Sequence, residues 1–291
     1  SFDQDKKPGA EILNTPWFDD KLVDLSKLIL DRENLGFDNN PDLFFIGFSA
    51  MDYVIHNYGP FSQETMDYLI RLDIQLNELI SHIDNTIGLE HVEFVLTSDH
   101  GGLPLPEFLP QLNLTGGRIN RDNLREAYDW IDDEISEYYG ENLFYKDFTN
   151  YYLFHDKLKK KNIEASDLEN IIKKYLGMVE GVKAVLSKTE IINSKKTDNV
   201  SLRLKNMVHV EKSADIFVII EPGYLYRNPY GTSHGSPYDY DAHVPLLFAK
   251  EGRSKTEIKV QAETVDIAPT ILNLLNIKTD YPFDGKVLQI Q

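Results

Sequence analysis

The chain has 291 residues, of which 42% are hydrophobic and 26% are charged, so it is long enough and apolar enough to fold around a sizeable core. Its 30 Lys and Arg residues against 47 Asp and Glu residues leave a net charge of −17, which repels the phosphates of nucleic acids, so we expect no nucleic-acid partner. The absence of cysteine excludes disulfides and thiolate metal sites, and any metal ion must be bound by His and carboxylate side chains.

The first hundred residues predict alternating helices and strands. The chain begins with Ser rather than Met, so we expect it to have been processed, trimmed or expressed as part of something longer. Apolar residues at helical spacing predict helices over 21–32 and 62–84, and continuous apolar runs predict buried strands over 43–48 and 92–97. A strand, a helix and a strand in this order predict a right-handed crossover that joins two parallel strands.

The rest of the chain predicts an inserted subdomain and a return to the main sheet. Helical patterns cover 122–139 and 165–175, and β-like patterns cover 182–192, 201–211 and 216–221. We expect residues 118–212 to form a smaller, partly antiparallel subdomain inserted in one domain. A strand over 244–249 and a helix over 264–275 complete an α/β fold with a mainly parallel sheet flanked by helices. No apolar run approaches the roughly 20 residues of a membrane span.

The first candidate for chemistry follows the run over 43–48. Asp52 and His56 are four residues apart, so in a helical turn they lie on one face, where a carboxylate and an imidazole can bind the same cation. The alternative is a hydrogen bond on the helix surface, or a capping pair, without any metal.

A second carboxylate and imidazole pair ends the strand predicted over 92–97. Asp99 and His100 are followed by Gly101 and Gly102, and ligands in open α/β sheets gather beyond the carboxyl ends of strands. A turn in which the glycines supply positive φ is the alternative explanation.

The third candidate is His234, in the glycine-rich segment before the strand predicted over 244–249. Its small neighbours allow a ligand to approach closely, and we prefer it to His243, which leads into a buried strand. We expect Asp241 to contact the ligands rather than the metal, and His243 either to do the same or to be a core histidine.

The segments SAMDYVIH (49–56), TSDHGG (97–102) and GTSHGSPYDYDAHVPLLF (231–248) together resemble the alkaline phosphatase superfamily. Within it they are most similar to the zinc-dependent phosphomonoesterases of the PafA type, which are related to the nucleotide pyrophosphatase/phosphodiesterases. The resemblance covers residues 1–291 as the C-terminal portion of one alkaline-phosphatase-like α/β domain. It implies that the N-terminal half of that domain precedes this chain.

The resemblance also implies a site with two Zn²⁺ ions, which together clamp an in-line displacement at phosphorus. It assigns Asp52, His56 and His234 to the ion on the leaving-group side, and Asp99 and His100 to the ion beside the nucleophile. The Thr or Ser nucleophile, which forms a covalent phospho-intermediate, is expected in the preceding segment. No catalytic residue is therefore assigned in this chain.

The function implied by the resemblance is hydrolysis of small phosphate esters by a phosphomonoesterase that is periplasmic or secreted. Within the same chemistry the alternatives are a phosphodiesterase, a nucleotide pyrophosphatase or a sulfatase. From a different class, the chain is a metal-binding but catalytically inactive fragment or a pseudoenzyme, and we expect the chain alone to be inactive. A purely structural α/β module would require all three motifs to be turn chemistry.

Overall fold

The computed structural model describes residues 10–147, 149–226 and 230–290, which divide into two compact units. The first unit comprises residues up to 50, residues 68–98 and residues from 245 onward, and the second comprises residues 51–67 and 99–244. Both units combine helices with strands, which confirms the predicted α/β class. Within the described ranges, no helix combines the length and the apolar character needed to cross a bilayer.

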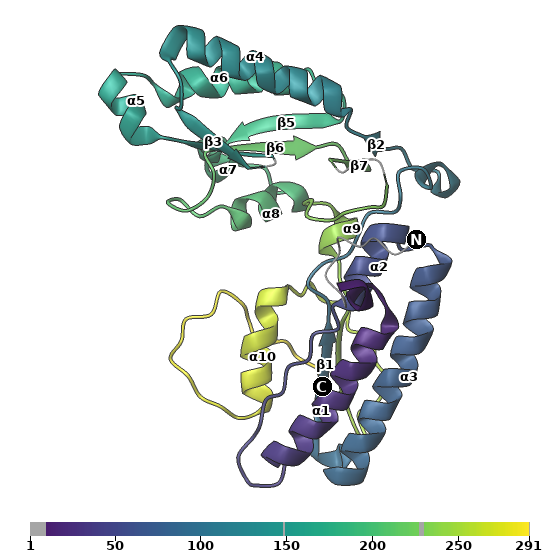
Figure 1. The fold of residues 1–291 in the computed structure, drawn as a ribbon. Coiled ribbons are helices and arrows are strands. Elements are labelled where there is room, and N and C mark those ends of the chain that lie inside the picture. Colours follow the sequence, from purple (N-terminus) through teal and green to yellow (C-terminus); the bar gives the residue numbers. More distant parts are fainter. Residues whose placement is uncertain (1–9, 148, 227–229, 291) are drawn as a thin grey trace. The chain divides into compact units, whose positions relative to one another are not determined.

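The first unit is organised around two long helices, α1 (Pro16–Glu33) and most of α3 (Gln63–Thr86), which lie side by side in Figure 1. Val23 and Leu30 of α1 pack with Leu79 and Ile83 of α3, so apolar residues at helical spacing form this core. The structure thus confirms both helices that the sequence periodicity predicts. The unit also contains β1 (Glu93–Thr97), β8 (Leu246–Lys250) and, near the end of the chain, α10 (Ile267–Leu274).

The strand pairing of the first unit differs from the prediction. β1 and β8 are antiparallel, and residues 43–48 form no strand, so the predicted parallel crossover pair is wrong. Alternate side chains of this segment, Phe44, Ile46 and Phe48, pack against the core, whereas Phe45 is 75% exposed. An apolar run indicates burial, but a strand also requires a neighbouring backbone, and the described residues supply none to this segment.

The second unit contains a four-stranded sheet in the order β3-β4-β6-β5, in which all neighbouring strands are antiparallel. Helices α4 and α6 cover one face, and α7 and α8 cover the other (Figure 1). Along β6, Ile216 faces the first layer while Phe217 and Ile219 face the second, as the alternation of a strand buried on both faces requires. The elements of this unit are α2 (Ala50–Tyr58, all but its first residue), β2 (Gly117–Arg118), α4 (Arg121–Tyr139), β3 (Phe144–Asp147), β4 (Asn150–Leu153), α5 (His155–Lys161), α6 (Ala165–Leu176), β5 (Val182–Ser187), α7 (Lys188–Asn193), α8 (Asn199–Met207), β6 (Ile216–Ile220), β7 (Tyr224–Leu225) and α9 (Asp239–Ala242).

Two segments predicted as strands are helical over part of their length. The β-like pattern over 182–192 is a strand only as far as Ser187, where a capping box with Glu190 begins α7. The pattern over 201–211 belongs largely to α8, whose N-cap Asp198 accepts a hydrogen bond from the backbone N–H of Ser201. These side-chain caps satisfy the free N–H groups of the first turn, and they outweigh the weak alternation of apolar residues.

The insertion expected over 118–212 stays a prediction, and the structure favours a later end. β2 and β7 form a short parallel pair, in which Gly117 lies opposite Tyr224 and Arg118 opposite Leu225. The four-stranded sheet lies between these two strands in the sequence and extends to Ile220. We therefore propose that the subdomain runs from β2 to β7.

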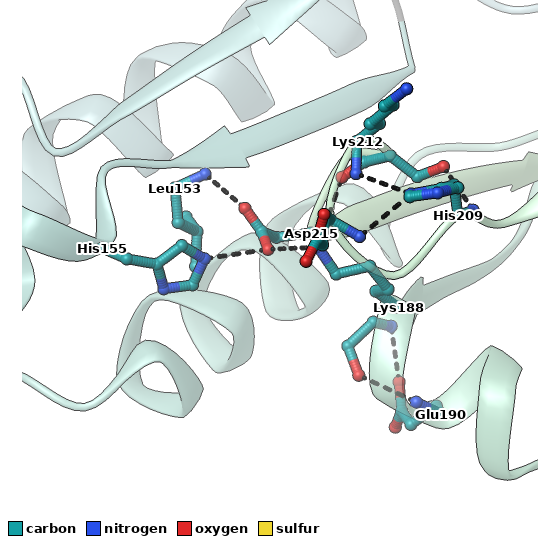
Figure 2. A network of polar contacts seen from close by, with 10 residues as sticks. Leu153, His155, Lys188, Glu190, His209, Lys212 and Asp215 are labelled. Atoms are coloured by element: carbon teal, nitrogen blue, oxygen red, sulfur yellow. Dashed lines mark hydrogen bonds and ion pairs between the residues drawn. The ribbon is translucent and has the colours of Figure 1, made fainter.

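A partly buried carboxylate connects three elements of this subdomain (Figure 2). Asp215 accepts hydrogen bonds from the backbone N–H of Leu153 at 2.8 Å and from His155 Nε2 at 2.9 Å, and Lys188 Nζ lies 3.1 Å from it. Burial opposes ionisation of Asp215, but these hydrogen bonds outweigh it and hold the pKa of its carboxyl below the ordinary value. The carboxylate is therefore ionised when folded, and it anchors β4, α5 and α7 to one point.

We expect Asp215→Asn to lower the free energy of unfolding by about 2–4 kcal/mol, because it leaves Lys188 without its charged partner. His155→Ala removes an exposed partner and should cost less than about 1 kcal/mol. Since the folded pKa of Asp215 is depressed, its contribution is present above pH ~4 and is lost as the pH falls through the folded pKa. Urea unfolding of both variants at several pH values tests this, and equal losses would contradict it.

Candidate metal centre

Helix α2 presents two of the predicted ligands on one face. Asp52 lies in its first turn and His56 in its last, and Asp52 Oδ2 is 3.4 Å from His56 Nε2. The spacing of four residues produces this proximity, because side chains at i and i+4 lie one above the other.

The third predicted ligand comes from a loop that lies 178 residues after His56 in the sequence. His234 Nε2 is 3.2 Å from His56 Nε2 and 3.6 Å from Asp52 Oδ1. In the described part of the chain, Asp52, His56 and His234 form the one group of three side chains whose ligand atoms all lie within 4.8 Å of one another. The structure thus brings together the three residues that the resemblance assigned to one ion.

A backbone contact holds the His234 loop against α2. The N–H of Thr232 donates to the carbonyl oxygen of His56 at 2.9 Å, and His56 Nδ1–H donates to the carbonyl oxygen of Thr232 at 2.8 Å. A Cβ at Gly231, whose φ is +74°, would lie 2.0 Å from the carbonyl oxygen of His56, so only glycine allows this approach. We call the contact of Gly231 and Thr232 with His56 the backbone latch.

The latch determines which nitrogen of His56 can bind a metal. A carbonyl oxygen can only accept, so the 2.8 Å contact with Thr232 places the imidazole proton on Nδ1. The lone pair of the neutral ring is then on Nε2, the atom that faces Asp52 and His234. Thr232 is itself fully buried, and its hydroxyl donates to the carbonyl oxygen of Leu103 at 2.5 Å.

The second predicted pair lies beside the first three ligands. The His100 ring stacks on the His234 ring, with centroids 3.4 Å apart, and His100 Nε2 is 3.9 Å from Asp52 Oδ1. The side chain of Asp99 is 86% exposed, and its Oδ2 is 3.6 Å from His100 Nε2. The pair therefore adjoins the group of three without joining it.

Burial sets the charge of two groups near this centre. It lowers the pKa of His234, and the neighbouring His100 lowers it further, which favours the neutral imidazole that ligates metals. Burial also raises the pKa of Asp241, while hydrogen bonds from Ser236 oppose that change.

The two residues expected to support the ligands differ in their surroundings. Asp241 is 4% exposed, and its carboxylate accepts hydrogen bonds from Ser236 in the His234 loop. His243 is exposed, and it follows α9, where its backbone N–H donates to the carbonyl oxygen of Asp239. Asp241 contacts the ligand loop, whereas among the described contacts His243 has none with the three ligands.

Sequence reasoning missed the residues that build the latch. The small side chains of GTSHGS indicate access to His234, but nothing in the motif indicates that Gly231 and Thr232 contact His56. Sequence reasoning also missed a cavity of about 1010 Å³ adjoining His234, whose wall includes Arg121, Arg125 and Tyr226. A contact between two distant backbones leaves no periodic signal in a sequence, and neither does a cavity.

The donor set fits a transition-metal cation. Two imidazole nitrogens and one carboxylate converge, and the latch leaves the His56 lone pair on the converging side. Three such ligands with a remaining open position are typical of catalytic zinc sites.

The chain has relatives among known phosphatases. The model of the type I phosphodiesterase / nucleotide pyrophosphatase family matches residues 4–243. Alkaline phosphatase PafA of Elizabethkingia meningoseptica is 28% identical over 279 residues, which cover 95% of this chain and 50% of that protein. Alkaline phosphatase PhoV of Synechococcus elongatus is 28% identical over 270 residues, which cover 91% of this chain and 48% of that protein.

A solved structure supports the same relationship. The crystal structure of wild-type alkaline phosphatase PafA matches with a TM-score of 0.85 at 26% identity, over 95% of this chain and 53% of that one. This match confirms the alkaline-phosphatase-like fold expected from the three motifs. The chain spans about half the length of the relatives it matches.

Two glycines of the His234 loop provide a matched test of the backbone latch. Gly231→Ala combines a positive φ with the clash against His56, and we expect it to lower the free energy of unfolding by about 3 kcal/mol or more. Gly235→Ala also has a positive φ, but its Cβ would meet nothing within 4 Å, so about 1 kcal/mol is expected. Urea unfolding of the metal-free chain measures both, and similar losses would show that the close approach is unimportant.

Proposed function

Because the chain belongs to the type I phosphodiesterase / nucleotide pyrophosphatase family, we propose that it provides metal ligands of a zinc-dependent phosphate-ester hydrolase, a phosphomonoesterase that acts on small esters. The observation that carries this proposal is the convergence of Asp52, His56 and His234 on one point. The names of the matched relatives, alkaline phosphatases PafA and PhoV, support the reaction class.

Zinc is proposed because of the ligand chemistry. Imidazole nitrogen together with carboxylate oxygen suits Zn²⁺, whereas Mg²⁺ and Ca²⁺ prefer all-oxygen sites. When bound, zinc supplies Lewis-acid stabilisation of a phosphoryl oxygen and lowers the pKa of water.

In this proposal the chain's own residues bind the metal ion and orient the imidazole ligands. Asp52 contributes the negative charge of the site, and the backbone latch keeps the His56 proton on Nδ1, away from the metal side. The cavity beside His234 gives the ester space to enter. Arg121 and Arg125 in its wall favour anionic ligands, in a chain whose net charge otherwise repels them.

The second ion of the pair is proposed to use Asp99 and His100. Two residues do not complete a zinc site, and we propose that its further ligand and the Thr or Ser nucleophile lie in sequence outside this chain. Exposed apolar side chains of the first unit support the proposal that a further segment packs there. These side chains are Leu43, Phe45, Leu96 and Leu247. Export to the periplasm or secretion, as the resemblance implies, stays a prediction.

A catalytically silent, metal-binding chain is the second candidate. It is favoured by the fact that, in the part of the chain that the structure describes, only Asp52, His56 and His234 form a group of three ligands. We propose that this describes the chain tested alone, as a fragment or a pseudoenzyme. Formation of a covalent phosphoprotein by this chain by itself would contradict it.

Zinc titration tests the site in this chain. After stripping of metal, we expect one tight equivalent of Zn²⁺ that His234→Ala and Asp52→Ala each lose, because two ligands bind a cation far more weakly than three. The control is His243→Ala, which removes an exposed histidine nine residues along the chain and should keep the equivalent. Zinc at 100 times its Kd should raise the free energy of unfolding by about 2.7 kcal/mol. The prediction fails if the wild-type chain binds no tight zinc, or if the control loses it too.

Turnover tests the proposed reaction in the full-length parent. We expect His234→Ala and Asp52→Ala to lower kcat/KM for an aryl phosphate by at least about 100-fold, which corresponds to about 2.7 kcal/mol of transition-state stabilisation. His243→Ala again serves as the control. Intact turnover in the first two variants would exclude the mechanism. Rates on phosphate diesters, nucleotide pyrophosphates and sulfate esters distinguish the alternatives within the class.

A further inference from the structure

Asp241 lies between the two loops that carry His234 and His100. Its Oδ2 accepts hydrogen bonds from the backbone N–H of Ser236 at 2.8 Å and from the Ser236 hydroxyl at 2.6 Å. Its own carbonyl oxygen accepts a hydrogen bond from the N–H of Gly101 at 2.7 Å. One residue of α9 therefore bonds to both loops. It contacts Ser236, two residues after His234, and Gly101, one residue after His100.

The turn at His100 rests directly on the backbone of α9. A Cβ at Gly101 would lie 2.2 Å from the carbonyl oxygen of Tyr240 and 3.5 Å from the Cα of Asp241. Only glycine permits this contact. The backbone of α9 at Asp241 therefore helps to fix the turn that carries His100.

One oxygen of the Asp241 carboxylate lacks a hydrogen-bond partner among the described residues. Oδ1 is buried and makes no hydrogen bond within the described residues, although Oδ2 makes two. A buried charge that is only half satisfied is costly unless an opposite charge compensates it. Besides Ser236, which donates to Oδ2, His234 and His100 are near enough for their charge to act on this carboxylate, and these are the side chains that would carry a cation.

We propose that Asp241 is a positioning residue that fixes the His234 loop and the His100 turn relative to each other, and whose buried negative charge strengthens cation binding at these histidines. This inference rests on the metal site proposed above. It adds a residue that acts on the ligand loops in two ways, through its carboxylate, which accepts hydrogen bonds from Ser236, and through its backbone carbonyl, which accepts one from Gly101. Outer groups of this kind commonly change metal affinity by 10- to 100-fold.

Two substitutions separate the charge of Asp241 from its hydrogen bonds. Asp241→Asn keeps an acceptor oxygen for Ser236 but loses the charge, and we expect it to weaken Zn²⁺ affinity about tenfold. Asp241→Ala loses both, and should weaken affinity about 100-fold and alter the visible spectrum of Co²⁺ bound in place of zinc. Asp239→Asn is the matched control, because it removes an exposed carboxylate of the same helix and should leave affinity within about twofold. Competition with a chromophoric chelator measures all three.

A second measurement does not need the metal. In the metal-free chain, amide hydrogen exchange at Ser236 should be slow in the wild type and in Asp241→Asn, and fast in Asp241→Ala. If both Asp241 variants bind zinc as the wild type does, the inference is wrong while the proposed site stands. If the wild type and His234→Ala alike bind no zinc, the proposed site is wrong. Exchange at Ser236 then decides the positioning role alone, and an unchanged rate in Asp241→Ala would refute it.

Discussion

The candidate metal centre depends on one close approach between two backbones. Gly231 and Thr232 pack onto the carbonyl of His56, and no Cβ fits between them. α2 supplies Asp52 and His56 through helical spacing alone, but His234 joins them only where this contact forms. The same contact fixes the proton of His56 on Nδ1, so one constraint determines both the position of a ligand and the availability of its lone pair.

The sequence predicts well what arises from local periodicity and local motifs. α1, α3, α4 and α6 follow from apolar residues at helical spacing, because one buried stripe per helix leaves a repeating pattern. Asp52 and His56 could be paired from their spacing, and His234 from its place in an ordered set of motifs. The resemblance of the ordered set of motifs to a family indicates which distant segments meet in space, which no single segment indicates.

What the sequence does not predict depends on contacts between distant segments or on competing local signals. The run over 43–48 lacks a pairing backbone, and β1 pairs with β8, although nothing within β1 specifies its neighbour. In α7 and α8 two local signals compete, because alternating apolar residues favour a strand, whereas Ser187 with Glu190 and Asp198 with Ser201 form helix caps. The backbone latch could not be predicted, because it follows from how far Gly231 must approach His56.

The geometry of the three imidazoles limits what the centre can bind. His56 Nε2 and His234 Nε2 are 3.2 Å apart, and the His100 ring stacks on His234, so protonation of all three rings would concentrate positive charge in a partly buried space. Burial disfavours that state, as the lowered pKa of His234 indicates. Neutral rings with the His56 proton on Nδ1 direct lone pairs toward Asp52, whose charge attracts a cation. The lowered pKa of His234 therefore means that protons compete less well with a metal ion for this ring.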